Sequence, residues 1–215
     1  MDNYFTHPSY LKIANKPVLA VYQWSKLCGQ LGKTPDDVAK VLERVRDACR
    51  QKGFDGLWLL GRAGDRGPAD SFDYAFSYLG GGRLSANSSS IATVSMGWNQ
   101  EPWGRANGGS RHSPSEFKAL CTQAREQMDK LPDSHLGRRL LLLDNWNEWG
   151  EGHYLAPHRQ YGFGYLDAVR EVFAQPSPEH RDIAPDDIGR GPYDRRYRTA
   201  TGRQIQSEAG RERAE

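Results

Sequence analysis

Cysteine is scarce in this sequence, and its pattern excludes a disulfide scaffold. Three cysteines, Cys28, Cys49 and Cys121, occur in 215 residues, and an odd number without a pairing pattern argues against a disulfide framework. Cys49 and Cys121 fall on apolar helix faces, so both are expected to be buried thiols. No group of Cys and His residues has the spacing of a zinc site. We therefore expect no metal centre.

Charge of one sign is also lacking, and so are long apolar runs. The net charge is +2, which gives no sign that nucleic acid or a membrane is the main partner. No run approaches the length of a membrane span. The N-terminus has no basic segment followed by an apolar one, which predicts a cytoplasmic protein if Met1 is the true start.

The glycines at 80–82 lack the Lys-Ser/Thr of a phosphate loop, and no cofactor is expected.

What is present is an alternation of short apolar strands and amphipathic helices. This order is typical of an α/β fold. Thr34 is a natural N-cap, Pro35 suits the first helical turn and Gly53 suits the position after the helix. The predicted helices are 34–53, 114–128 and 165–173. The predicted strands are 18–22, 56–61, 91–98, 140–147 and, as a weaker strand or a short helix, 72–78.

The number of predicted strands leaves two versions of this fold class open. We count about five strands, whereas a closed (β/α)8 barrel has eight. Either the fold is an open α/β sheet or the chain is part of a barrel. Residues 1–174 are the predicted folded domain. Residues 175–215 are rich in charge and poor in aliphatics, which predicts an extended or disordered polar tail. Its arginines would suit nucleic acid, but interleaved acids favour a solvated tail.

The stretch from Leu140 to Gly152 carries the chemistry. It begins as an apolar strand and ends in two carboxylates, Glu148 and Glu151. A helical turn would place residues three apart on one side, and the neighbouring glycines make such a turn easy. Glycoside cleavage needs a carboxylate pair, because the leaving oxygen is protonated while the anomeric carbon is attacked. A capping or surface pair at the end of a strand is the alternative.

Three segments within 146–166 resemble a known family. Trp146-Asn147-Glu148-Trp149-Gly150-Glu151-Gly152, then 154–157 and 161–166, resemble the WbsX-like proteins, which belong to the group with a glycoside hydrolase family 99-like domain. The resemblance covers roughly residues 4–174. It implies the C-terminal portion of a (β/α)8 TIM barrel, with the chain beginning near the fourth strand and the acid pair after the last.

The resemblance also implies roles for the two glutamates. Glu148 would deprotonate the sugar 2-hydroxyl, which attacks the anomeric carbon, and Glu151 would be the general acid and then the base for water. WbsX proteins are also labelled glycosyltransferases of polysaccharide biosynthesis, so transfer to another sugar stays open beside hydrolysis. A truncated, inactive relative that only binds glycan stays open too. Such a half-barrel would expose strand edges and favour self-association.

The partner implied is a glycan, and several side chains are candidates to bind it. Asn99 stands where the family commonly has an acid, which would remove an acidic sugar contact. His153, beside the acid pair, is expected to be an exposed loop residue, with a sugar contact as the alternative. Aromatic residues near strand ends suit sugars, although core packing is equally open for each. The substrate-binding candidates are Tyr22, Trp24, Trp98, Asn99, Trp146, Asn147 and Tyr154.

Overall fold

A computed structural model describes residues 4–65, 67, 68, 71–79, 82, 89–105 and 109–175. The chain divides into two units, Met1–Ala174 and Gln175–Glu215, and the elements below all belong to the first. From residue 176 onward the predicted tail lies outside the described residues, as does most of the glycine-rich loop at 80–88.

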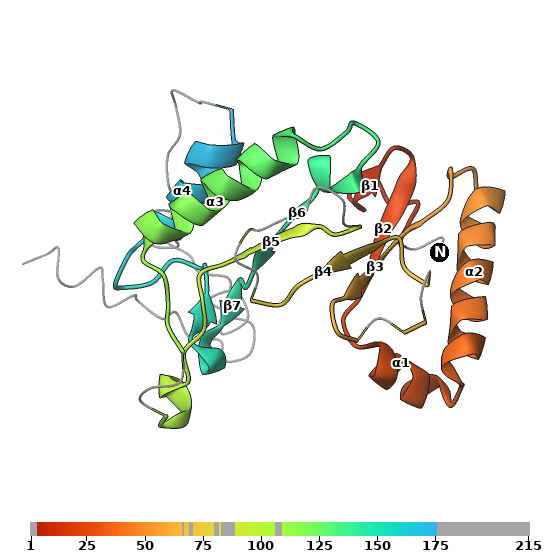
Figure 1. Ribbon diagram of the computed structural model, residues 1–215, viewed down its shortest axis with the longest axis horizontal. Coiled ribbons are helices and arrows are strands. Elements are labelled where there is room, and N and C mark those ends of the chain that lie inside the picture. Colours follow the sequence, from red (N-terminus) through yellow and green to blue (C-terminus); the bar gives the residue numbers. More distant parts are fainter. Residues whose placement is uncertain are drawn as a thin grey trace, which may run out of the picture. The chain divides into compact units, whose positions relative to one another are not determined.

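Parallel strands form the framework of the first unit (Figure 1). Four strands pair in the order β1-β2-β3-β4, and β2, β3 and β4 run parallel. β5 and β6 form a second parallel pair, and β7 and β8 an antiparallel one. The strands are β1 Lys12–Ile13, β2 Lys16–Val21, β3 Trp58–Arg62, β4 Tyr74–Phe76, β5 Ala92–Ser95, β6 Leu141–Asp144, β7 Asn147–Glu148 and β8 His153–Tyr154.

Hydrogen bonds connect β4 to the residues that precede β5. Ala75 N donates to Ser89 O at 2.8 Å, and Ile91 N donates to Ala75 O at the same distance. Ala75 and Ser90 form a parallel bridge. Each strand from β2 to β6 therefore neighbours the next one in the sequence. This arrangement confirms the α/β class, and the described residues contain no closed barrel.

Local sequence signals explain most of the helix boundaries. Thr34 Oγ1 accepts from Asp37 N at 3.2 Å, and Ser113 forms a capping box with Glu116. Gly53 has a φ of +87°, which favours glycine just after a helix. The α-helices are α1 Trp24–Leu31, α2 Pro35–Gln51, α3 Pro114–Asp129 and α4 Gly164–Phe173. The 3-10 helices are η1 Glu101–Trp103, η2 Leu136–Arg138 and η3 Trp149–Glu151.

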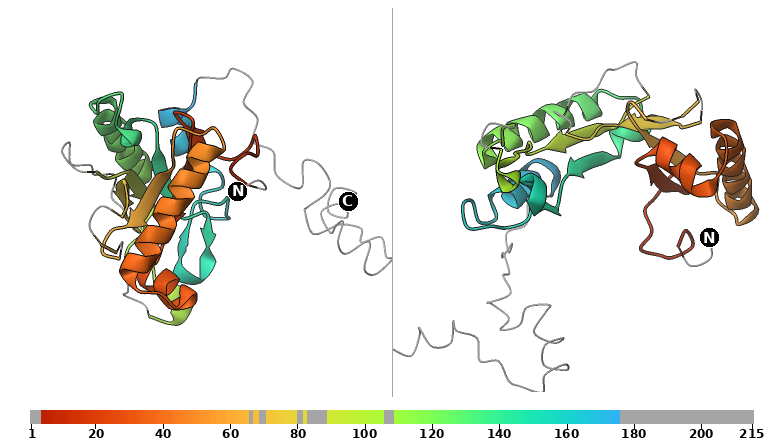
Figure 2. Two further views of the ribbon diagram at one scale, coloured as in Figure 1. Left: turned by 90° about the vertical axis from the view of Figure 1, so that its right-hand side faces the viewer. Right: turned by 90° about the horizontal axis from the view of Figure 1, so that it is seen from below.

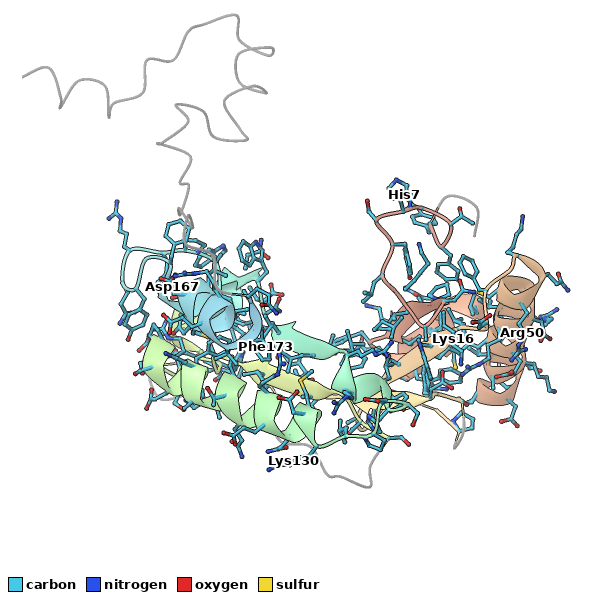
Figure 3. All side chains as sticks on the ribbon, turned by 90° about the horizontal axis from the view of Figure 1, so that it is seen from above. His7, Lys16, Arg50, Lys130, Asp167 and Phe173 are labelled. Atoms are coloured by element: carbon cyan, nitrogen blue, oxygen red, sulfur yellow. The ribbon has the colours of Figure 1, made fainter. Side chains whose placement is uncertain are left out.

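The helices bury apolar faces against the strands. Val38, Leu42 and Cys49 of α2 pack in a core cluster with Leu59 of β3. The polar face of α2 carries surface pairs such as Arg50 with Asp47 (Figure 3). A second cluster joins α3 and α4 to β5 (Figure 2). All three cysteines are free and buried, which confirms that Cys49 and Cys121 are core thiols.

Alternate residues of β3 face opposite sides of the sheet. Leu59 packs against α2, whereas Leu60 lies in a different cluster with Ile91, Leu136 and Leu140. Partly buried aromatic and aliphatic residues pack against that cluster. They are Ile13, Val18, Trp58, Tyr74, Phe76 and Leu142. Both faces of this part of the sheet are therefore apolar, which is characteristic of parallel sheets covered on both sides.

Three features of the sequence prediction need correction or completion. The strand predicted over 140–147 stops at Asp144, because the chain turns there toward β7. The weak segment 72–78 contains a strand, β4, and no helix. Helix α1 had not been predicted, since it is short and Gln23 at its N-cap makes no side-chain capping bond. Among the described residues, no helix has the length and apolar character needed to cross a membrane.

Candidate active site

The two glutamates lie on a short excursion that follows β6. The chain leaves β6 through a cis peptide bond between Asp144 and Asn145. Glu148 ends β7, and Glu151 is the last residue of η3. Gly152 then turns the chain into β8 with a φ of +57°, and a Cβ at this position would lie 2.7 Å from Asn99 O. The sequence therefore needs glycine here for both conformation and space.

Both carboxylates line one open cavity of about 460 Å³. Its walls come from the residues at or beyond the carboxyl ends of β2, β4 and β6, together with Thr93 of β5. This is the side of a parallel sheet on which ligands bind in α/β proteins. The other lining residues are Tyr22, Phe76, Ser77, Tyr78, Leu142, Leu143, Asp144 and Asn145.

Tyr78 holds one of the two carboxylates. Its phenol donates to Glu151 Oε2 at 2.8 Å, and its ring packs edge-on against Tyr22 with 5.7 Å between centroids. Burial raises the pKa of Tyr78 well above its ordinary value of 10.0, and the hydrogen bond to Glu151 raises it further. Tyr78 is therefore a neutral donor at physiological pH. The prediction from sequence missed it as a site residue, although it is the last residue of the predicted segment 72–78 and lies just beyond β4.

A buried polar cluster lies behind the glutamates. His153 Nε2 is 2.9 Å from Ser95 Oγ and 3.5 Å from Asp144 Oδ2. Asp144 Oδ2 also accepts from Leu79 N at 2.7 Å. The cluster therefore connects β5, β6, β8 and the segment after β4. Burial raises the pKa of Asp144, against the lowering effect of the Leu79 amide and of His153.

The expectation that His153 is an exposed loop residue is wrong. Its side chain is 0 % exposed, because β8 pairs with β7 and directs it toward Ser95 and the ring of Tyr78. Its Nδ1 is buried and has no hydrogen-bond partner among the described residues. Asp144 makes hydrogen-bonding and charge contacts at the end of its strand.

The predicted sugar-binding residues separate into four groups. Tyr22 lines the cavity of the glutamates. Trp24 is 3 % exposed and packs against Phe72 in the core, which corrects its prediction as a sugar contact: α1 turns it inward. Asn99 and Tyr154 line a second cavity. The remaining candidates line neither cavity: Trp98, which contacts Trp103, Trp146, which is exposed, and Asn147, which lies in β7.

The described part of the chain contains no group of three or more His, Cys, Asp or Glu residues arranged to hold a metal ion. The site is defined instead by two glutamates, a neutral tyrosine donor and a buried Asp-His-Ser cluster, on an α/β framework.

Comparison with known proteins finds similarity over the part of the chain that contains this site. The family described as Glycosyltransferase WbsX matches residues 81–169, which include both glutamates. The "Uncharacterized protein WxcX" of two strains of Xanthomonas campestris pv. campestris is 24% identical over 205 residues. The alignment covers 80% of this chain and 29% of that relative. The chain thus spans less than a third of the curated relatives that it matches.

The part of the chain that contains the site is similar to the WbsX family, which confirms the resemblance of the motifs within 146–166. The description of that family suggests a carbohydrate-active protein. No solved structure matches the chain significantly.

Proposed function

We propose that this chain carries the acid–base pair of a carbohydrate-active domain, residues 1–174, that acts on a glycosidic bond of an oligosaccharide or polysaccharide. One observation carries the proposal: Glu148 and Glu151 line the same cavity, on the ligand-binding side of a parallel sheet. A capping or surface pair would have no reason to share a cavity. Opening a glycosidic bond needs two such carboxyl groups with different roles.

The environments of the two glutamates differ, and this difference suits separate roles. Glu151 is partly buried and accepts from Tyr78, whereas Glu148 is exposed at the end of β7. The hydrogen bond uses Oε2 of Glu151, and Oε1 has no hydrogen-bond partner among the described residues. We assign Glu151 as general acid and base at the glycosidic oxygen. We assign Glu148 as the base that takes the proton of the sugar 2-hydroxyl, as the family resemblance implies.

The scaffold that would hold this pair is the C-terminal portion of a (β/α)8 barrel. Two observations support it: the parallel strands β2 to β6 follow one another in chain order, and the cavity lies at their carboxyl ends. In such barrels the active site is at the carboxyl end of the strands. Aromatic and aliphatic residues on one face of the sheet, such as Phe76 and Leu142, would then belong to the barrel interior.

Transfer of a sugar is the second candidate, and the description of the matching family favours it. The same carboxylates serve both reactions, because the acceptor is water in one and a sugar hydroxyl in the other. A glycan-binding relative without turnover is the third.

The test compares the wild type with Glu148→Gln and Glu151→Gln on α-mannosides and bacterial polysaccharides, with and without a sugar acceptor. Each substitution keeps the size of the side chain and removes its acid–base chemistry. We expect a loss of turnover of at least about 100-fold in each, since acid–base catalysis typically contributes 10²–10⁴-fold. Glu126→Gln, an exposed position on α3, is the matched control and should keep full activity.

The outcomes separate the candidates. Free reducing sugar indicates hydrolysis, and a lengthened acceptor indicates transfer. Glycan binding without turnover in the wild type would support the binding relative. Turnover that survives both substitutions would refute the assignment of the glutamates.

A further inference from the structure

A second cavity, of about 240 Å³, lies next to the candidate active site. A hydrogen bond links the two linings: Asn99, which lines the second cavity, donates its backbone N–H to Glu151 O at 3.1 Å. None of the described lining residues carries a carboxylate. They are Met96, Asn99, Arg111, His112, Tyr154, His158, Gln160, Tyr161 and Tyr165.

Arg111 is the one fixed positive charge of this lining. Its Nη1 donates to Tyr154 Oη at 2.7 Å, and its guanidinium lies over the Tyr154 ring, 5.8 Å from the centroid. These two contacts orient the guanidinium. A guanidinium has five N–H donors in a planar fork, and Tyr154 takes one of them. The fork is therefore held in place with donors left for a ligand.

Glu101, whose carboxylate pairs with Arg111, competes only weakly with an incoming anion for the guanidinium. Glu101 Oε2 is 3.7 Å from Arg111 Nη2, and the Glu101 side chain is 58% exposed. An exposed ion pair of this kind contributes little to stability, because water screens both charges. An incoming anion that bonds to two N–H groups of the fork would displace it, because bidentate charge-assisted hydrogen bonds are stronger than a single loose contact.

The aromatic part of the lining suits the ring and hydroxyls of a sugar. His158 stacks on Tyr165 with 5.8 Å between centroids and contacts Tyr154 and Tyr161 edge-on. Its Nδ1 is 3.1 Å from Ala156 O, and because a carbonyl only accepts, that nitrogen carries the proton. In the neutral ring Nε2 is then an acceptor for a hydroxyl group. Aromatic faces and an acceptor beside a cation fit a sugar that bears an anionic group.

We propose that this cavity binds the anionic group of an acidic sugar, a carboxylate or a phosphate, in the fork of Arg111. The inference rests on the proposed function for its substrate class: the glycan acted on at Glu148 and Glu151 is acidic, and one charged unit occupies the second cavity. The anion site itself depends only on Arg111 and its surroundings.

Binding of small probes to the full chain tests the site directly, by calorimetry or by NMR titration. The probes are glucuronate, inorganic phosphate and, as the neutral counterpart, glucose. We expect both anions, or the one that the site prefers, to bind at least 10-fold more tightly than glucose. The preferred anion tells carboxylate from phosphate. Equal binding of glucose and of both anions would overturn the proposal.

Variants of opposite sign make the test sharper. Arg111→Gln should weaken binding of the preferred anion at least 10-fold, and Glu101→Gln should tighten it, because a competing carboxylate is removed. Arg125→Gln removes a surface arginine that pairs with Asp129 on α3 and should leave binding unchanged. Unchanged binding in a folded Arg111→Gln variant would overturn the proposal. If that variant does not fold, Glu101→Gln decides, and unchanged or weaker binding there would refute it.

The same titration with Glu148→Gln and Glu151→Gln separates this inference from the proposed function. Anion binding that persists in both variants, whether or not they are inactive, supports the anion site. If both variants lose turnover but the wild type acts equally on neutral and acidic glycans, the glutamate assignment stands and the acidic substrate is refuted.

Discussion

The phenol of Tyr78 and the carboxylate of Glu151 are joined by a hydrogen bond of 2.8 Å, although 73 positions separate them in the sequence. Tyr78 follows β4, and Glu151 ends the turn after β7. This bond connects two segments that meet only at the carboxyl ends of the strands. It fixes the side chain to which we assign the acid–base role.

Tyr78→Phe should lower turnover without abolishing it. The substitution keeps the ring against Tyr22 and removes the donor to Glu151. A hydrogen bond to a charged group contributes roughly 1.5–3 kcal/mol, so we expect about a 10- to 100-fold fall in kcat with a smaller change in KM. Tyr4→Phe, at an exposed tyrosine, is the matched control. A rise in KM with kcat unchanged would mean that Tyr78 binds substrate and does not hold Glu151.

The ionisation of Tyr78 should be delayed in an alkaline titration followed by ultraviolet difference absorbance. Burial, and then the bond to Glu151, raise the pKa of Tyr78 above its ordinary 10.0. Because the folded-state pKa is raised, the stability that this phenol contributes is complete below pH 10.0 and is lost as the pH rises through the folded value. Glu151→Gln should shift the transition of Tyr78 to lower pH. The Tyr78→Phe variant identifies the signal, and no shift in Glu151→Gln would argue against the bond.

His153→Ala should destabilise the fold. The substitution removes a fully buried ring that lies between Ser95 and Asp144. Leaving buried polar groups without a partner costs about 1–3 kcal/mol, which urea unfolding would measure. The control is His7→Ala at an exposed histidine near the N-terminus (Figure 3), with an expected change within about 0.5 kcal/mol. Equal stability of the two variants would contradict a structural role for the buried cluster.

Cys121 should be inert toward thiol reagents in the folded protein. Its side chain is 0% exposed, and burial raises its pKa to about 12. The thiolate, which is the reactive form, is therefore scarce and inaccessible. Mass spectrometry after alkylation should find Cys121 unmodified in buffer and modified in denaturant. Cys121→Ser is the control that identifies the modified peptide, and rapid labelling in buffer would contradict its burial.

Much of the framework could be predicted because its signals are local. The caps at Thr34 and Ser113, the apolar faces of α2 and α3 and the apolar strands depend on near neighbours in the chain. The α/β class follows from their alternation. Helix α1 was missed because it has only eight residues and Gln23 at its N-cap makes no side-chain capping bond, although Gly32 caps its C-terminal end.

The site could be predicted only in part, for the same reason. Glu148 and Glu151 belong to one short motif, so the sequence places them together on a turn. Tyr78, Ser95 and Arg111 come from other segments, and nothing local distinguishes them from ordinary polar residues. The same limit explains Trp24 and His153: one is drawn into the core by α1, and the other is directed inward by the pairing of β8.

The sequence by itself determined most of the longer helices and strands, the fold class, the family resemblance and the position of the acid pair, since each depends on residue order within a short window. Only the tertiary structure decided which side chains meet that pair. Pairing of parallel strands brings distant strand ends to one edge of the sheet, where burial raises the pKa of Tyr78 and its phenol donates to Glu151.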